Sequence, residues 1–231
     1  MIEENLHKIS MELPSDVTLV AVSKFHPLPA LIEAYLEGQR VFGENRPQEF
    51  AAKAVQLSQD IEWHFIGHLQ TNKLKLVLPY AYMVESVDSV RLLDAIDTWG
   101  FLHSKTVRVL LELHLGAEVT KHGLSEDEIR EILSAAVTPL PDGGQSYRNV
   151  RFCGLMGMAT NTDDESVVRA DFQRISSLME SLSAEFGVDS SPVLSDFREL
   201  SIGMSHDWRI AVEYGATIVR IGTDIFGNRQ Y

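Results

Sequence analysis

The sequence predicts an α/β protein whose fold is a single-domain TIM-type (β/α)8 barrel. Three observations predict it. Short apolar runs of strand length recur along the chain, and helical patterns alternate with them. The length of 231 residues suits one barrel. Strand–helix units continue on both sides of the one Pro- and Gly-rich stretch, TPLPDGGQSYR, so we expect this stretch to be a loop and not a linker. Residues 1–231 are then expected to form one domain. An open doubly wound sheet is the alternative.

The first elements are a helix and a strand–helix unit. Apolar residues at helical spacing predict the first helix: Ile2, Leu6, Ile9 and Leu13. Pro14 ends it. The run TLVAVSK then predicts a strand, and the apolar pattern over residues 28–36 predicts a helix that Gly38 stops.

The strand–helix unit then repeats. The next three strands are VFGE, WHFIG and MVES. The helix after the first is expected to begin at Asn45, the helix after the second to run from Thr71 to Pro79, and the helix after the third to end near Gly100.

The second half of the chain completes the eight strands. TVRVLLELHL and VRFCGLMGMA are each followed by the spacing of a capping box, at Ser125 with Glu128 and at Thr162 with Glu165. ELSIGM and TIVRIG are the last two strands. After Gly227 four residues remain, too few for a closing helix, so we expect the N-terminal helix to cover that part of the barrel wall.

Composition narrows the class of protein. Acidic residues number 33 and basic residues 20, and the net charge of −13 disfavours a nucleic-acid partner. Cys153, the only cysteine, lies in the apolar RFCGLMG and predicts a core residue. The N-terminus lacks the pattern of a targeting signal, and no apolar run is long enough to cross a membrane. We therefore expect a soluble, cytoplasmic protein.

The loops after the last two strands are candidates for an anion site, because barrels often bind phosphate there. The first contains Met204 and Ser205, with Ser205 expected as the N-cap of the next helix. The second contains Gly222 and Thr223, where a missing side chain lets a ligand approach the backbone. The alternative is that Ser205 is only a cap and Gly222 only a turn.

Lys24 ends the first strand. It shares a strand face with Val20 and Val22, so we expect it at the inner carboxyl end of the barrel. Its amine is either solvated at the mouth or held inside the barrel for a function. In the second case, partial burial would lower the pKa of Lys24 and supply the neutral amine that attacks an aldehyde. Arg220 shares a face with Gly222, and its alternative role is an internal salt bridge.

Histidines also stand close together in WHFIGH, at His64 and His68. That stretch has strand character, and no third ligand is evident beside the pair. We therefore expect no metal site.

Six blocks carry a resemblance to a known family: AVSKFHP, FGENRPQE, WHFIGHLQTNK, GLMGMAT, LSIGMSHDW and VRIGTDIFG. In order and spacing they resemble the YggS/PROSC family of pyridoxal-phosphate-binding homeostasis proteins. The resemblance implies a barrel similar to the N-terminal domain of alanine racemase, the fold-type III architecture, with pyridoxal 5'-phosphate as cofactor.

The resemblance also implies roles for individual residues. Lys24 would hold the cofactor as an aldimine. The other cofactor contacts would be the phosphate-binding Ser205, Gly222 and Thr223, with Met204 in the same loop, Arg220 at the pyridine nitrogen, and Asn45 near the ring. No catalytic residue is implied. Two positions depart from the family pattern: Arg46 follows GEN where an aromatic is usual, and His114 stands where Asn is usual.

The function implied is cofactor homeostasis. An arginine offers only donors, so the ring nitrogen beside it stays unprotonated and the ring is a weaker electron sink. We expect a monomer that binds the cofactor, influences amino-acid and keto-acid balance with little or no turnover, and delivers cofactor to apo forms of enzymes that use it. The alternatives are a pyridoxal-phosphate-dependent racemase or decarboxylase, a Schiff-base aldolase, and a regulatory binding module.

Overall fold

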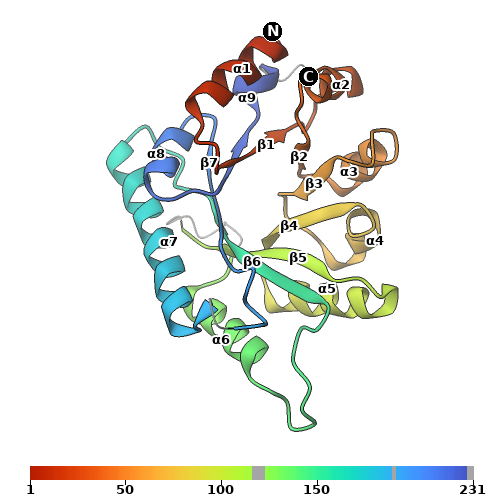
Figure 1. Ribbon diagram of the computed structural model, residues 1–231, viewed down its shortest axis with the longest axis vertical. Helices are drawn as coiled ribbons and strands as arrows, with labels where there is room; N and C mark the ends of the chain where they lie inside the picture. Colours follow the sequence, from red (N-terminus) through yellow and green to blue (C-terminus); the bar gives the residue numbers. More distant parts are fainter. Residues whose placement is uncertain (116–122, 189–190, 228–231) are drawn as a thin grey trace.

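The computed structural model describes residues 1–115, 123–188 and 191–227. Within them eight parallel strands close into a barrel in chain order, and β8 pairs with β1 to complete it (Figure 1). The predicted barrel is confirmed, and the open sheet is wrong. The strands are β1 (Thr18–Val22), β2 (Val41–Glu44), β3 (Glu62–Phe65), β4 (Ala81–Val87), β5 (Val107–Leu113), β6 (Val150–Gly157), β7 (Glu199–Met204) and β8 (Ile218–Ile221).

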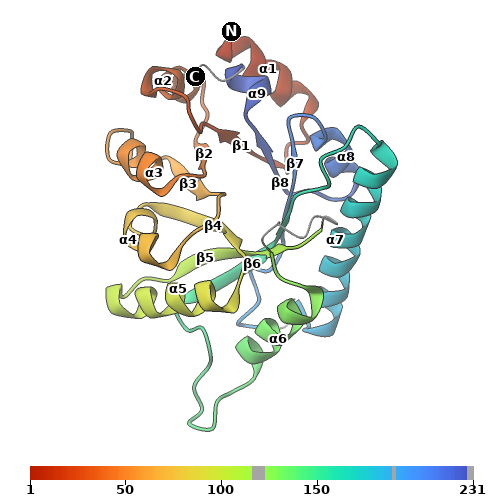
Figure 2. The same cartoon turned by 180° about the vertical axis from the view of Figure 1, so that it is seen from behind.

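Helices occupy the connections between the strands and lie outside the barrel (Figures 1 and 2). They are α1 (Ile2–Glu12), α2 (Leu28–Leu36), α3 (Pro47–Ala54), η1 (Thr71–Lys73) with α4 (Leu74–Val77), α5 (Val90–His103), α6 (Glu126–Val137), α7 (Glu165–Glu185), α8 (Trp208–Glu213) and α9 (Thr223–Phe226). None of the described helices is long and apolar enough to cross a membrane.

Two apolar layers make the core. The outer layer lies between strands and helices, where the apolar faces of α1, α6 and α7 are buried; for α1 these are Ile2, Leu6 and Ile9, as the sequence predicts. The inner layer fills the barrel and consists of Val20, Met83, Leu110, Cys153, Met156 and Ile218. Cys153 is the core residue that the sequence predicts, and burial raises the pKa of its thiol to about 11.

Helix starts are predicted less well than helix faces. The capping box of Ser125 and Glu128 is confirmed, with both reciprocal bonds present. That of Thr162 is wrong, because the side chain of Asp164 caps α7. Asn45 does not open α3, which begins at Pro47. Pro presets the backbone angle of a first helical turn and needs no acceptor for its nitrogen there.

The N-terminal helix α1 covers the wall beside the short final helix α9, as the sequence predicts (Figures 1 and 2). The side-chain amide of Asn5 donates to the backbone oxygen of Ile225 at 2.9 Å. Arg209 of α8 forms an ion pair with Glu12 at 2.6 Å. Helix α1 is therefore tied to both helices that follow the last two strands.

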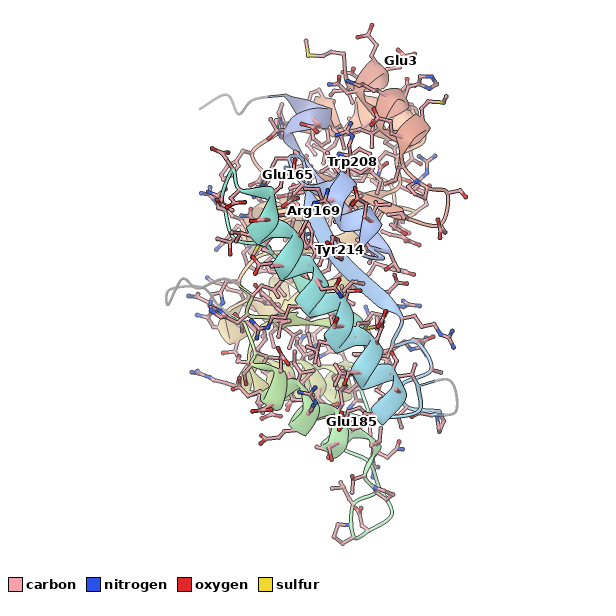
Figure 3. All side chains as sticks on the ribbon, turned by 90° about the vertical axis from the view of Figure 1, so that its left-hand side faces the viewer. Glu3, Glu165, Arg169, Glu185, Trp208 and Tyr214 are labelled. Atoms are coloured by element: carbon pink, nitrogen blue, oxygen red, sulfur yellow. The ribbon has the colours of Figure 1, made fainter. Side chains whose placement is uncertain are left out.

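Helix α7 is tied to α8 as well. Arg169 of α7 donates to Glu213 at 2.5 Å, and Phe172 packs against Tyr214 with ring centroids 6.5 Å apart. Figure 3 shows Arg169 and Tyr214 on this face of the molecule. Helix α8, which follows β7, is therefore held by side-chain contacts to both α1 and α7.

Candidate functional site

Lys24 lies in the turn that follows β1, at the carboxyl ends of the strands, which we call the mouth of the barrel. Val20 belongs to the inner apolar layer. A Cβ placed on Gly43 would meet the side chains of Val20 and Val22, which lie on one face of β1. Lys24 follows Val22 by two residues, lies just beyond the end of β1 and is half-buried.

Gly222 and Ser205 meet beside the end of β1. The Gly222 N–H donates to the Ser205 hydroxyl at 3.3 Å. A Cβ on Gly222 would lie 3.1 Å from the backbone oxygen of Val22. Residues from β1, β7 and β8 are thus brought together at one edge of the mouth, as the sequence predicts.

The loop after β7 differs in one respect from the prediction. Ser205 is not the N-cap of α8; Asp207 occupies that position, and its carboxylate accepts from the Met204 N–H at 2.5 Å. Gly203 has φ +95°, and a Cβ there would lie 2.9 Å from the Trp208 Cα. The glycine therefore lets α8 pack against the end of β7. Because Asp207 is the N-cap, the Ser205 hydroxyl is left to accept from Gly222.

Thr223 is the first residue of α9, directly after Gly222. The first N–H groups of a helix have no acceptor within the helix. The backbone at Thr223 therefore offers hydrogen-bond donors at the same edge of the mouth as Ser205.

Arg220 lies inside the barrel. One terminal nitrogen donates to the backbone oxygen of Ser201 at 2.8 Å and to its hydroxyl, and the other donates to the Gly157 oxygen at 2.9 Å. Its guanidinium lies 3.6 Å from Glu85. The internal salt bridge considered for Arg220 therefore exists. These contacts leave further guanidinium N–H donors for a ligand.

Glu85 links Arg220 to His64. Its two carboxylate oxygens lie 2.5 Å from His64 Nδ1 and 2.6 Å from the Ser201 hydroxyl. Burial opposes ionisation of Glu85, but these bonds and the charge of Arg220 outweigh it, so the pKa of Glu85 lies below its ordinary value. Glu85 was not among the residues predicted from the sequence, although it is a carboxylate on the same strand face as Met83 within an apolar run.

Asn45 follows β2 at the mouth. Its side-chain oxygen is buried and makes no hydrogen bond to any described residue. A Cβ on Gly67 would lie 2.3 Å from the Asn45 backbone oxygen, so only glycine lets the end of β3 approach Asn45 this closely. A buried polar atom without a partner is uncommon in folded proteins and suits a ligand contact.

Glu112 is a second carboxylate near Arg220 and was also not predicted from the sequence. It is buried on β5, and burial, with a smaller contribution from Asp88, raises its pKa to about 7, against the opposing charges of Arg220 and His68. The site therefore includes a carboxyl group that changes charge near neutral pH.

The two histidines of WHFIGH have separate partners. His64 is buried against Glu85, whereas His68 is exposed and its Nδ1 lies 2.6 Å from Asp88. In the described part of the chain, no three His, Cys, Asp or Glu side chains are grouped to hold a metal ion.

The two departures from the family pattern lie near the mouth. The guanidinium carbon of Arg46 lies 4.4 Å from the ring centre of Phe25, the residue after Lys24. The backbone N–H of His114 donates to the Leu124 oxygen at 2.9 Å. Arg46 thus covers one side of the turn that carries Lys24.

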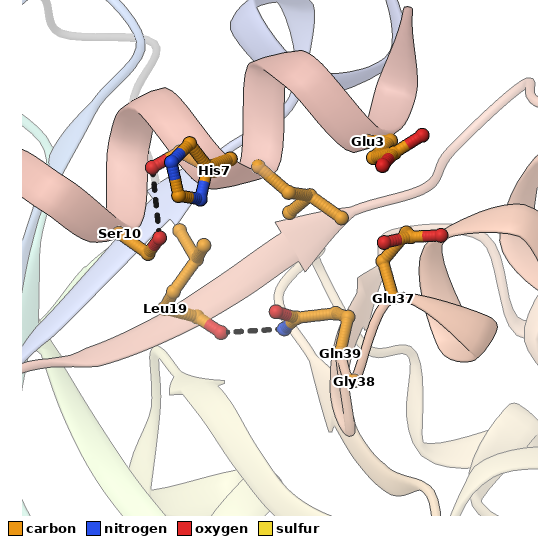
Figure 4. A pocket seen from close by; sticks show the side chains of 8 residues that line it. Glu3, His7, Ser10, Leu19, Glu37, Gly38 and Gln39 are labelled. Atoms are coloured by element: carbon orange, nitrogen blue, oxygen red, sulfur yellow. Dashed lines mark hydrogen bonds between the residues drawn. The ribbon is translucent and has the colours of Figure 1, made fainter.

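A separate pocket of about 330 Å³ lies beside α1 (Figure 4). His7, Ser10 and Gln39 line it, and Gln39 donates to the Leu19 oxygen at 2.8 Å. Leu19 lies early in β1 and Gln39 precedes β2, so this pocket is at the amino ends of the strands. It contains none of the residues of the mouth.

The residues at the mouth fit pyridoxal phosphate in their chemistry. Lys24 offers an amine, Arg220 offers donors, and Gly222 leaves space where a side chain would crowd Val22. The buried side-chain oxygen of Asn45 offers an acceptor.

Comparisons with known proteins agree on one relationship. The family model described as "Alanine racemase, N-terminal domain" matches residues 1–230. A human protein named pyridoxal phosphate homeostasis protein is 41% identical over 224 residues, which cover 92% of this chain and 77% of the relative. The structure of PipY from Synechococcus elongatus PCC7942 with PLP bound has a TM-score of 0.86 and 34% identity, covering 98% of this chain and 100% of PipY.

A more distant structure shows the fold alone. Alanine racemase from Corynebacterium glutamicum is 14% identical, with a TM-score of 0.72, and the match covers 99% of this chain and 60% of that enzyme. The predicted likeness to alanine racemase is therefore confirmed at the level of the barrel.

Proposed function

The chain belongs to the pyridoxal phosphate homeostasis proteins, within the family of the alanine racemase N-terminal domain, and we propose that it binds pyridoxal 5'-phosphate at the mouth with Lys24 as covalent anchor. The match to the PLP-bound structure of PipY, which extends over 100% of the PipY chain, supports this proposal. We propose further that residues 1–231 act as one domain and one monomer.

One observation carries the proposal most directly. Lys24 lies two residues beyond Val22, whose backbone oxygen borders Gly222, and Gly222 in turn donates to Ser205. These contacts support the proposal that an amine and a backbone-lined anion site share one edge of the mouth. A phosphorylated aldehyde needs both.

Each residue has a proposed task. The Lys24 nitrogen bonds to the aldehyde carbon with loss of water, while Ser205, Gly222 and Thr223 bind the phosphate, with Met204 in the same loop. Asn45 lies near the ring. Arg220 donates to the ring nitrogen; because its guanidinium stays charged and cannot accept a hydrogen bond, the nitrogen acts as acceptor and stays unprotonated. When bound, pyridoxal phosphate supplies an electron-withdrawing ring that stabilises negative charge on attached amino acids.

We propose a carrier rather than an enzyme with rapid turnover. Glu85 offsets the charge of Arg220 and contacts His64 through its other oxygen, so the inner end of the site is held by one buried ion pair and one buried hydrogen bond. An unprotonated ring nitrogen weakens the ring as an electron sink. Apo forms of pyridoxal-phosphate-dependent enzymes are the proposed recipients.

The visible absorption spectrum tests the anchor. The purified protein and Lys24→Ala would be recorded with added pyridoxal phosphate, before and after borohydride reduction. A band near that of a lysine-bound cofactor, fixed by reduction in the wild type and missing in the variant, is expected. A wild-type protein with no band in excess cofactor would sink the proposal and favour the aldolase.

The carrier role needs a separate measurement. Incubation of the loaded protein with alanine, or with other small amino acids, should give no racemised or decarboxylated product beyond that of free cofactor. An apo pyridoxal-phosphate enzyme mixed with the loaded protein should regain activity. Turnover of the amino acid would instead support the racemase or decarboxylase reading.

A further inference from the structure

A buried lysine outside the barrel holds the turn that carries Lys24. The side chain of Lys53, on α3, is only 7% exposed. Its nitrogen lies 2.6 Å from a Glu44 oxygen, 2.7 Å from a Glu49 oxygen and 2.8 Å from the backbone oxygen of Ser23. We call Lys53, Glu44 and Glu49 the clamp.

The clamp grips the chain on both sides of Lys24. Before it, the Ser23 backbone oxygen accepts from Lys53, and the Ser23 hydroxyl donates to Glu44 at 2.6 Å. After it, the Phe25 N–H donates to the same Glu49 oxygen that binds Lys53, at 2.7 Å. Both peptide neighbours of Lys24 are therefore hydrogen-bonded to charged groups.

The turn needs such a restraint. Phe25 has φ +68°, in the left-handed region that a bulky residue rarely adopts. A residue persists there only when its surroundings hold it. The bond from the Phe25 N–H to Glu49 is one such restraint. A relaxed turn would swing the adjoining Lys24 Cα away from its present direction.

The Lys53 ammonium also contacts the end of β2, through Glu44. Glu44 is the last residue of β2, directly before Asn45. Its carboxylate is fully buried, and burial raises its pKa above the ordinary value even though Lys53 and Ser23 lower it. Lys53 thus joins the end of β1 to the end of β2.

We propose that Lys53 is a positioning residue whose clamp aims Lys24 into the mouth and keeps Asn45 in register with it. This inference rests on the proposed function for its consequence, cofactor binding. Its premise, control of the Lys24 turn, concerns this chain alone. A purely structural Lys53 would only join α3 to β2.

The matched pair Glu49→Gln and Glu49→Ala tests the clamp at the more exposed of its two carboxylates, since the side chain of Glu49 is 22% exposed and that of Glu44 is fully buried. Glutamine keeps an oxygen for the Phe25 N–H, whereas alanine removes it. We expect Glu49→Ala to weaken pyridoxal phosphate binding by about tenfold, because reorienting a misplaced Lys24 takes up binding free energy, and about 1.4 kcal/mol corresponds to a tenfold change in Kd. Glu49→Gln should retain most of the affinity.

Lys53→Met tests the cation itself, with two controls. Phe50→Leu lies on the same helix, and Phe50 is fully buried against Trp63 and Phe65, so it lowers stability without touching the clamp. Lys75→Met removes one positive charge elsewhere. Lys53→Met should lose affinity well beyond a Phe50→Leu variant of equal thermal stability, and Lys75→Met should match the wild type.

Two readouts need no cofactor. Amide hydrogen exchange at Phe25, and the rate at which Lys24 is reductively methylated, should both change in Lys53→Met and Glu49→Ala and stay near wild type in Phe50→Leu. If the wild type binds no cofactor, the proposed function fails and these two readouts decide the inference. Unchanged exchange and reactivity in Lys53→Met, or equal affinity losses in Lys53→Met and Phe50→Leu, would overturn it.

Discussion

Replacing Glu85 with Gln removes one charge from the interior and keeps the shape of the side chain. At the 3.6 Å separation of Glu85 and Arg220, an effective dielectric of about 20 gives an attraction of about 4 to 5 kcal/mol. Removing one partner of a buried pair usually costs about 3 to 5 kcal/mol, because the other charge stays buried. We expect Glu85→Gln to lose about 3 kcal/mol of the free energy of unfolding at pH 7.

Thermal unfolding measures this loss. For a chain of this size about 3 kcal/mol corresponds to roughly 6 to 12 °C in Tm. The pH dependence gives a second check. The folded pKa of Glu85 is lowered from 4.5, so its stabilisation is complete above that value and is lost as the pH falls through the folded pKa.

Glu85→Gln should therefore lose that part of the acid sensitivity and should differ least from the wild type at low pH. His64→Gln separates the two contacts: it leaves the Arg220 contact in place but removes a bond that lowers the pKa of Glu85, so it should keep the acid sensitivity and move it to higher pH. A Glu85→Gln protein within about 0.5 kcal/mol of the wild type at pH 7 would refute the reasoning, because it would show that Arg220 does not need this carboxylate.

Three further predictions follow from single contacts. Gly222→Ala places a Cβ 3.1 Å from the Val22 oxygen, so the free energy of unfolding, measured by chemical denaturation, should fall by about 1 kcal/mol. The free energy of cofactor binding should fall by more than that. Glu112→Gln should raise stability at pH 8 by up to about 3 kcal/mol and have little effect at pH 4, because the raised pKa of about 7 makes the wild-type carboxylate costly only when ionised. Ser125→Ala should cost about 1 kcal/mol in chemical denaturation through loss of the capping box with Glu128, and an equally stable variant would contradict the cap.

The local patterns of the sequence predict the barrel well. Apolar spacing gives the buried face of α1, and the alternation of apolar runs with helices gives parallel strands. These signals survive because each depends on residues within one or two helical turns, or on the two faces of one strand.

Helix starts were predicted less reliably. Ser125 caps α6 as expected, whereas Asp164 replaces Thr162 and Asp207 replaces Ser205. The choice among neighbouring polar residues depends on where the preceding strand ends and what it packs against. The Ser205 hydroxyl instead accepts from Gly222, which is 17 residues away.

The sequence by itself determined the fold class, the apolar faces, and a lysine, an arginine and two glycine-containing loops at the carboxyl ends of strands. Only the tertiary structure decided which charges meet. Glu85 and Ser201 are separated by 116 residues, and Lys53 reaches Ser23 across 30. A buried charge must find a partner wherever the closed barrel brings one, and no local pattern records that distance.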